Sequence, residues 1–404
     1  LWFGGIGTYI RATSETDTDA GDRANDAIRI TADQLRAKAI GEGANLGLTH
    51  RARIEFATRG GRVNTDAVDN SAGVNSSDLE VNIKIALSAA EAAGKLTRPK
   101  RNRLLADMTD EVAELVLRNN YLQTLCLSTI EARGTREAEY LCRLMRDLES
   151  KDLLDRQLEF LPDDGTVSDR LAHNQGLLRP ETSVLMAYAK MVLFDDLMQT
   201  NVPDDPYFEE QLFRYFPAGM QKKYAKEISN HRLRREIVAT MLANGMINRG
   251  GPTFILRLQE ETGHDIAQIA KAYAVARDAF SLMESSGLID ELDNQVDGTL
   301  QVELYVQLQR ILRRATIWFL RNETFSEGIA ATVARYKKGI GEVSKNLKGA
   351  LPAYNWSRIE DRVASYTKQG VPSGTARSVS GLRYLLRATD IVQVAAQSRQ
   401  PVTN

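Results

Sequence analysis

The segment Gly94-Lys95-Leu96-Thr97-Arg98-Pro99-Lys100-Arg101-Asn102-Arg103 separates two parts of the chain that have different sequence patterns. Before it, residues 1–95 alternate between short apolar runs, glycine turns and helical stretches, which is typical of parallel strands alternating with helices. After it, apolar residues recur at three- and four-residue spacing between short turn signals, which predicts helices. We therefore expect a mainly α protein, with a partial α/β segment at 1–95 followed by a multi-helix, all-α domain at 96–404.

The first part predicts short elements in alternation. The run Leu1-Trp2-Phe3, stopped by Gly4-Gly5, is typical of the C-terminal end of a buried strand. Because the chain also begins with Leu instead of Met, we interpret it as a piece of a longer protein. Strands are expected near 35–40 and 62–68, and helices near 22–28, 49–58 and 77–93. A parallel sheet that is incomplete in this way leaves an edge that other segments can pair with.

Charge and hydropathy exclude several classes of function. The 404 residues carry 52 Lys and Arg against 53 Asp and Glu, so no net charge favours nucleic acid or an anionic membrane. No apolar run approaches the roughly 20 residues that span a bilayer. The basic run at 230–237 has acidic neighbours and is expected to be an ion-pairing helical face; a nucleic-acid patch is the less favoured alternative. We expect no nucleic acid and no membrane among the partners.

Cysteine and histidine usage indicates neither a disulfide framework nor a metal site. Cys126 and Cys142 lie among apolar residues at helical spacing and are expected to be buried, inert thiols. The four histidines show no metal-ligand spacing. The acidic run 17–22 has its glycine one position early for a calcium loop, and it lacks the glutamate that closes such a loop. A reducing cytoplasm fits this composition.

Two glycine-rich segments are candidates for ligand binding. Gly41-Glu42-Gly43-Ala44-Asn45-Leu46-Gly47 follows a predicted strand and precedes a predicted helix, where nucleotide-binding loops lie. Its last glycine is one residue late for G-x-G-x-x-G, and turns that need positive φ explain the glycines equally well. In Asn70-Ser71-Ala72-Gly73-Val74-Asn75-Ser76-Ser77-Asp78-Leu79-Glu80, the pattern Ser77-x-x-Glu80 predicts a capping box that opens the next helix. A helix N-terminus there could hold a substrate carboxylate.

At these two segments the sequence resembles glutamate dehydrogenases, specifically the very large bacterial NAD-dependent type. Gly41-Glu42-Gly43-Ala44-Asn45 is similar to the family's E-G-A-N signature. The stretch from Asp66 to Ser77 is similar to its D-x-x-x-N-A-G-G-V-x-x-S pattern. Further similar stretches begin at Leu1, Asp22, Met108, Leu178 and His231. The resemblance therefore extends over nearly the whole chain and implies a Rossmann-like nucleotide-binding segment at 1–95.

The resemblance implies oxidative deamination of L-glutamate to 2-oxoglutarate and ammonia, with NAD as cofactor. It places Gly43, Ala44 and Asn45 beside the nicotinamide, and Asn70 near the same ring or its ribose. It places Val74 on the methylenes of the substrate and Ser77 at its distal carboxylate. Ser71, Ala72 and Asp78 depart from the family pattern, and an acidic Asp78 beside a carboxylate site is unfavourable unless it points away.

No catalytic residue is assigned in this chain. The catalytic lysine, the proton-transferring aspartate and the glycine turn for the phosphates precede these motifs in the family, and none is identifiable here. We therefore expect the isolated chain to be inactive, since it lacks its general acid and base and most of its cofactor cradle. The resemblance also implies a cytoplasmic homo-oligomer. The competing hypothesis is a non-enzymatic helical scaffold, or an oligomerisation or regulatory module, whose glycines serve only as turns.

Overall fold

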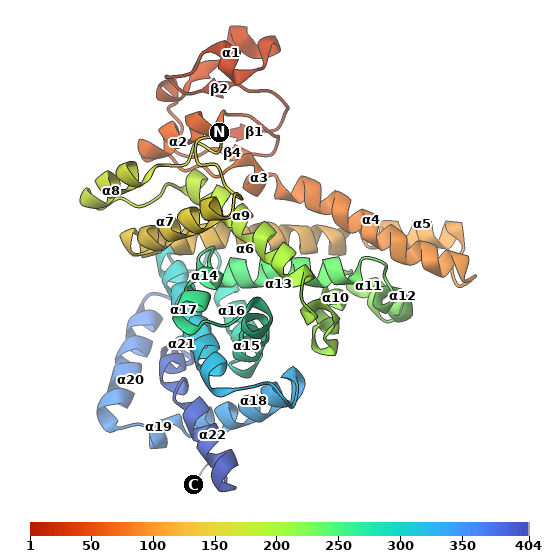
Figure 1. Cartoon of the computed structure of the whole chain (residues 1–404), viewed down its shortest axis with the longest axis vertical. Coiled ribbons are helices and arrows are strands. Elements are labelled where there is room, and N and C mark those ends of the chain that lie inside the picture. Colours follow the sequence, from red (N-terminus) through yellow and green to blue (C-terminus); the bar gives the residue numbers. More distant parts are fainter. Residues whose placement is uncertain (403–404) are drawn as a thin grey trace. The chain divides into compact units, whose positions relative to one another are not determined.

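The computed structural model of the chain describes residues 1–402 and is mainly helical (Figure 1). It divides into two compact units, Leu1–Thr253 (unit 1) and Phe254–Asn404 (unit 2). The mainly α fold class is confirmed, as are the small parallel sheets in the N-terminal part. The expected boundary near residue 95 lies inside unit 1, and a domain boundary at that position stays a prediction.

The strands of the N-terminal segment form two separate parallel pairs. β1 (Trp2–Phe3) pairs with β4 (Gly41–Glu42), and β2 (Ile10–Arg11) pairs with β3 (Ile30–Thr31). Two predicted strands are wrong. Residues 35–40 lie outside the strands because β4 begins at Gly41, and residues 62–68 contribute a single parallel bridge before a helix begins. In a two-stranded sheet, the partner strand decides which residues form each strand, and the local apolar run does not.

Short helices fill the connections between these strands. The predicted helix near 49–58 is confirmed as α2 (His50–Thr58): Thr49 accepts a hydrogen bond from the N–H of Ala52 at its start, and Gly60 has φ +85° just past its end. A small core of apolar side chains holds α2 against β2 and the chain after it. The others are α1 (Asp17–Ala20), η1 (Arg23–Ile28), η2 (Ala32–Gln34), α3 (Asp66–Asp69) and α4 (Ser71–Ala92).

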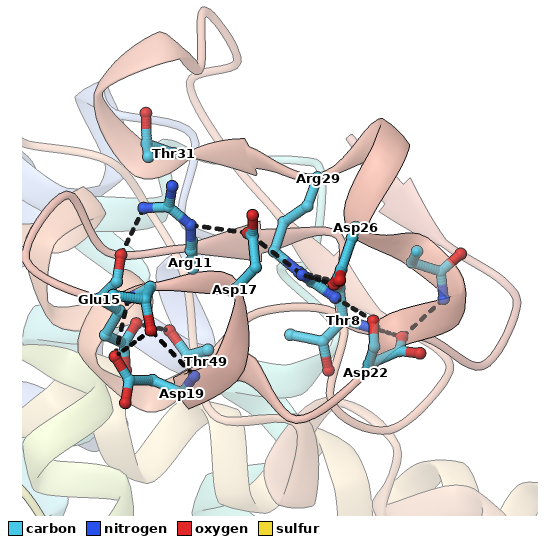
Figure 2. A network of polar contacts seen from close by, with 12 residues as sticks. Thr8, Arg11, Glu15, Asp17, Asp19, Asp22, Asp26, Arg29, Thr31 and Thr49 are labelled. Carbon is cyan, nitrogen blue, oxygen red and sulfur yellow. Dashed lines mark hydrogen bonds and ion pairs between the residues drawn. The ribbon is translucent and has the colours of Figure 1, made fainter.

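The acidic run 17–22 takes part in a cluster of ion pairs and hydrogen bonds (Figure 2). The side chain of Arg29 is fully buried and binds Asp17, Asp26 and the carbonyl of Thr8. Bonds from Arg11 and Arg29 lower the pKa of Asp17. Asp22 accepts from the N–H of Thr8. These carboxylates therefore face arginines and amide groups of the same cluster, and within residues 1–402 no group of His, Cys, Asp or Glu converges as a metal site would require.

The rest of unit 1 is helical, and its centre is a set of three long helices. α13 (Arg234–Gly250) packs against α9 (Arg179–Met198) and α6 (Thr109–Arg133), and α6 also packs against α4. Pro180 lies in the first turn of α9, as expected, where its missing N–H costs nothing. The remaining elements of unit 1 are α5 (Arg98–Asp107), α7 (Thr135–Ser150), α8 (Asp164–Ala172), η3 (Val202–Asp204), η4 (Pro206–Phe208), α10 (Glu209–Tyr215), α11 (Ala218–Gln221) and α12 (Ala225–Ser229).

Three sequence expectations concern single stretches of this helical part. Cys126 and Cys142 are confirmed as buried free thiols, and burial raises the pKa of Cys126 to about 11. The basic run at 230–237 is not one helix, because α12 ends at Ser229 and α13 begins at Arg234. Its Arg235 pairs with Asp204, in agreement with an ion-pairing role. Across residues 1–402, no helix combines the length and the apolar character needed to cross a membrane.

Unit 2 is a helical assembly around α15 (Ile266–Ala279), which is buried on almost every side. α15 packs against α17 (Gly298–Asn322) and α18 (Ile329–Lys345), and α18 packs against α22 (Ala388–Ser398). Small side chains such as Ala270, Ala272 and Ala274 are fully buried on α15, which lets neighbouring helices approach closely. The remaining helices are α14 (Phe254–Thr262), α16 (Leu282–Asp290), α19 (Leu347–Ala350), α20 (Ala353–Lys368) and α21 (Ser373–Leu385).

The contact between α18 and α22 depends on Gly339. A Cβ at this position would lie 2.3 Å from Cγ2 of Val392, whereas a Cβ at Gly341 on the same helix would meet nothing within 4 Å. We expect Gly339→Ala to destabilise unit 2 by about 1–3 kcal/mol through overpacking, despite the better helix propensity of Ala. Gly341→Ala is the matched control and should stabilise by up to about 1 kcal/mol. Denaturant unfolding of both variants measures the difference, and equal stabilities would contradict the close packing.

Candidate functional site

The two glycine-rich segments meet at one hydrogen bond. The Nδ2 of Asn70 donates to Oδ1 of Asn45 over 2.8 Å, across 25 positions of sequence. Asn45 is exposed, and within residues 1–402 its Nδ2 has no hydrogen-bond partner. The hydrogen bond from Asn70 therefore orients the carboxamide of Asn45 through its Oδ1 and leaves its Nδ2 open to donate.

The loop after β4 is pinned to β1 by its backbone. The N–H groups of Gly43 and Ala44 both donate to the carbonyl of Phe3, at 2.9 and 3.1 Å. These two residues therefore have no free N–H to offer a ligand, and Ala44 is itself buried. The loop can bind through its shape, its carbonyl oxygens and the side chain of Asn45.

The glycines of this loop are not explained by positive φ, because Gly41, Gly43 and Gly47 all have negative φ. The residue with φ +60° is Leu46. A Cβ on Gly43 would lie 2.3 Å from the Trp2 ring, and one on Gly41 would lie 2.8 Å from it. The alternative based on turns with positive φ is therefore wrong here: Gly41 and Gly43 leave room for the indole of Trp2, and Gly47 leaves room for Phe3.

The helix after the second segment begins earlier than predicted. α4 starts at Ser71, with Asn70 as its N-cap residue, so Ser77 lies within the helix. The predicted capping box Ser77-x-x-Glu80 is wrong, and the expectation that Ser77 sits at a helix N-terminus fails with it. Residues 71–76 are poor helix formers on average. Tertiary contacts extend the helix through them: Asn120 of α6 donates to Oγ of Ser71 over 3.0 Å.

Asn70, Val74 and Ser77 share one stripe of this helical stretch, because they are spaced four and three residues apart. Val74 is 69% exposed and Ser77 is also exposed, so the stripe leads from the Asn45 contact along an open face. Gly73 makes the start of the stripe possible. A Cβ there would come within 2.7 Å of Oδ1 of Asn70 and displace the carboxamide. The stripe of Asn70, Val74 and Ser77 thus begins at the contact with Asn45.

The carboxylate of Asp78 is held by groups outside this stripe. Its Oδ2 accepts a hydrogen bond of 2.6 Å from the hydroxyl of Tyr215 on α10, and its Oδ1 is 3.3 Å from Nδ2 of Asn82. Burial and the Asp78 carboxylate raise the pKa of Tyr215, so the phenol remains protonated and keeps donating. The acidic residue that seemed incompatible with a neighbouring carboxylate ligand is therefore engaged by Tyr215 and Asn82.

A buried ion pair supports the loop from behind, and the sequence analysis missed it. Glu42 is completely buried and binds Arg53 of α2 through two hydrogen bonds of 2.7 and 2.9 Å. Burial raises the pKa of Glu42, and Arg53 opposes the rise. Nη2 of Arg53 also lies 3.3 Å from Asp66. The only signal for this pair was the glutamate of the E-G-A-N signature itself, since its partner Arg53 looks like an ordinary helix residue.

Two aspartates connect the ends of the two segments. Oδ2 of Asp66 accepts from the N–H of Leu46 at 2.8 Å, and Oδ2 of Asp69 accepts from the N–H of Glu42 at 3.0 Å. Burial raises the pKa of Asp69, with a hydrogen bond from Asn64 acting in the opposite direction. Both aspartates belong to the D-x-x-x-N pattern, and their role is to bind the first segment's backbone. The two segments therefore form one structural unit.

His50, the first residue of α2, is a partly buried histidine close to this unit. Burial lowers its pKa to about 4, and the nearby positive charge of Arg53 adds to the effect. The imidazole is therefore neutral at neutral pH. The charges beside the loop are those of Glu42, Arg53, Asp66 and Asp69.

Comparison with known proteins gives two family matches that together cover most of the chain. Residues 1–130 match the family described as bacterial NAD-glutamate dehydrogenase, catalytic domain. Residues 174–404 match the family described as glutamate dehydrogenase, C-terminal. The chain belongs to the family described as glutamate dehydrogenase, C-terminal, whose model matches more than half of it.

Curated relatives with the name NAD-specific glutamate dehydrogenase align along almost the whole chain. The protein of Halomonas elongata is 44% identical over 398 residues, that of Pseudomonas aeruginosa 44% over 396, and that of Mycobacterium tuberculosis 36% over 392. These alignments cover 97–98% of this chain but only 24–25% of each relative. The chain thus spans about a quarter of the length of the NAD-glutamate dehydrogenases that it matches.

The catalytic-domain match contains both segments of the site, and the residues present fit a nicotinamide. The carboxamide of nicotinamide both donates and accepts hydrogen bonds, and the open Nδ2 of Asn45 can donate to its carbonyl oxygen. The space beside the Cα of Gly43 is taken by the Trp2 ring, so the open polar group of this loop is the exposed side chain of Asn45.

Proposed function

We propose that the complete protein is an NAD-dependent glutamate dehydrogenase that oxidatively deaminates L-glutamate to 2-oxoglutarate and ammonia. The observation that carries the proposal is the hydrogen bond between Asn70 and Asn45, which joins the two family motifs. The family matches support it, and so does the name of the relatives. We further propose that the enzyme is a cytoplasmic homo-oligomer.

In this proposal the chain supplies the nicotinamide side of the cleft. NAD, when bound, accepts the hydride from the α-carbon of glutamate. Asn45 donates to the nicotinamide carboxamide, and Asn70 holds Asn45 in the orientation for this bond. Gly43 and Ala44 form the floor through their backbone, which is tied to Phe3. Val74 contacts the substrate methylenes and Ser77 donates to the distal carboxylate, both from the exposed stripe of α4.

The competing hypothesis is a non-enzymatic helical scaffold whose glycines serve only as turns. The interpretation of these glycines as turns that need positive φ fails, because Gly41, Gly43 and Gly47 have negative φ. The helical remainder can still brace the enzyme, mediate oligomer contacts or carry a regulatory site.

A direct assay tests the proposal. The complete protein should form NADH from NAD only when L-glutamate is added, and it should run in reverse with 2-oxoglutarate and ammonia. The isolated 404-residue chain should show no turnover, because no catalytic lysine, proton-transferring aspartate or phosphate-binding glycine turn is identifiable in its sequence. Glutamate-dependent NADH formation by the purified chain alone would refute the prediction that the chain lacks residues needed for turnover.

The role of Ser77 can be tested against its neighbour Ser76. In the complete enzyme we expect Ser77→Ala to raise the KM for glutamate by about 10- to 100-fold, through loss of a charge-assisted hydrogen bond. Thermal stability should stay unchanged, because Ser77 is exposed and does not cap the helix. Ser76→Ala is the matched control: Ser76 is also exposed and its hydroxyl bonds the carbonyl of Ala72. If the two variants have equal KM values, Ser77 is not a substrate residue.

A further inference from the structure

We propose that Arg179 is a positioning residue for the cofactor loop. It lies outside the catalytic-domain match and inside the C-terminal match, at the first residue of α9. Through Asn64 it holds Asp69, which in turn binds the N–H of Glu42. The proposal rests on the proposed function, because it assigns to the C-terminal region a part in shaping the same nicotinamide site.

The side chain of Arg179 is placed by many bonds at once. Its Nε donates to Oδ1 of Asn64, its Nη1 donates to Oγ of Ser128 at 3.1 Å, and its Nη2 donates to the carbonyl of Thr124 at 3.0 Å. Its pair with Glu131 is a weaker hold, because the glutamate is 70% exposed. The planar guanidinium thus joins α6 to the segment before α3, with only 18% of the side chain exposed.

Asn64 transmits this hold to the loop. Its Oδ1 accepts from Arg179, and its Nδ2 donates to Oδ1 of Asp69 over 2.6 Å. The other carboxylate oxygen of Asp69 accepts from the N–H of Glu42 over 3.0 Å. One carboxylate oxygen of Asp69 is therefore bound through Asn64 to the C-terminal region, and the other is bound to β4, which leads into the loop that carries Asn45.

The helix α6 holds the second segment in a parallel way. Nδ2 of Asn120 donates to the carbonyl of Val68 at 2.8 Å and to Oγ of Ser71 at 3.0 Å. These two positions flank Asn70, which orients Asn45. The helices that follow residue 95 thus position both asparagines of the pair. Arg179 acts on the loop of Asn45, and Asn120 acts on the residues beside Asn70.

The charge of Asp69 gives the arrangement a physical reason. A partly buried carboxylate needs positive charge or donors nearby, and Arg179 lies one residue away across Asn64. Without the guanidinium, Asn64 is free to turn, and Asp69 loses both an oriented donor and a neighbouring positive charge. The bond from Glu42 to Asp69 would then loosen, and the loop that ends in Asn45 would lose its fixed position.

The first test uses the 404-residue chain without any nucleotide. Hydrogen exchange resolved to single amides should show the Glu42 amide exchanging about tenfold faster in Arg179→Gln than in wild type. The Phe216 amide, which bonds to the carbonyl of Phe213 at the end of α10, is the internal reference. Arg179→Lys should behave like Arg179→Gln, because lysine keeps the charge but cannot reproduce the fork of bonds. Asn64→Ala breaks the same relay and replaces Arg179→Gln should that variant fail to fold.

Arg156 offers a matched control. Its side chain is 10% exposed and pairs with Glu149 and Asp164, within the same unit but apart from Asn64 and Asp69. Arg156→Gln should lower the melting temperature without changing the exchange rate of the Glu42 amide. In the complete enzyme, Arg179→Gln should raise the dissociation constant of NADH by about tenfold and lower kcat, while Arg156→Gln leaves both unchanged.

The outcomes separate this inference from the proposed function. A Glu42 amide that exchanges at the wild-type rate in Arg179→Gln overturns the inference, and so does a faster rate without any loss of NADH affinity. Rescue of both readouts by Arg179→Lys also overturns it, because charge alone would then be enough. A wild-type complete enzyme that binds no NADH counts against the proposed function, and the exchange measurement then decides the positioning role by itself.

Discussion

Glu42→Gln should destabilise unit 1 by about 3 kcal/mol, the cost of removing one partner of a buried ion pair. The substitution keeps the shape of the side chain, so the loss reports the charge. Arg53 would remain buried with Asp66 at 3.3 Å as its nearest anion, and its bidentate partner would be gone. Hydrogen exchange of the α2 amides under increasing denaturant measures this loss within unit 1, apart from the unfolding of unit 2.

The same substitution at an exposed pair is the control. Glu80 and Lys84 pair on the surface of α4 with 56% and 42% of their side chains exposed. Glu80→Gln should therefore change the stability by less than about 1 kcal/mol. The double variant Glu42→Gln with Arg53→Met should recover part of the loss, because no buried charge then lacks its partner. If Glu42→Gln is as stable as Glu80→Gln, the ion pair between Glu42 and Arg53 does not stabilise unit 1.

Asn70→Ala should lower kcat/KM of the complete enzyme by about 100-fold, the size of effect expected when a reacting group is misplaced by about 1 Å. Without the donor from Asn70, the carboxamide of Asn45 is free to rotate, and its open Nδ2 no longer points in one direction. NADH affinity should fall with it. Asn70→Asp should be equally damaging, because a carboxylate cannot donate to Oδ1 of Asn45.

Asn82→Ala gives the matched comparison for this prediction. Asn82 is also an asparagine of the α4 region, but it is buried and donates to the hydroxyl of Tyr215. Its loss should reduce stability and leave kcat/KM within a few-fold of wild type. If Asn70→Ala also costs only stability, the carboxamide pair holds the fold together and has no part in cofactor binding.

Local patterns in the sequence predicted much of the site. The motif residues Asn45 and Asn70 were expected to serve one cofactor, and they are in hydrogen-bond contact. Helix α2 was expected near residues 49–58 from its composition and from the glycines after it, and it forms at His50–Thr58. Apolar periodicity indicated the long helices, because the helix period records which face each one buries. The individual roles of the site residues stay predictions.

Local patterns failed where a distant partner decides the outcome. Ser77 looked like a helix cap, but α4 begins at Ser71 because Asn120 binds the turn before it. The glycines of the first segment fitted turns as well as a ligand-binding loop, but Gly41 and Gly43 make room for Trp2. In both cases the deciding contact comes from a segment distant in the sequence, so the pattern of nearby residues does not predict it.

The sequence by itself therefore determined the mainly helical class and the presence of the two motifs, because periodicity and short motifs depend on residues a few positions apart. Only the tertiary structure decided which groups hold the motifs in place. The pair of Glu42 with Arg53, the start of α4 and the hold of Arg179 on Asn64 depend on packing between segments 11 to 115 positions apart. A side chain's partner at such a distance is set by how helices and strands pack, and local propensity carries no information about it.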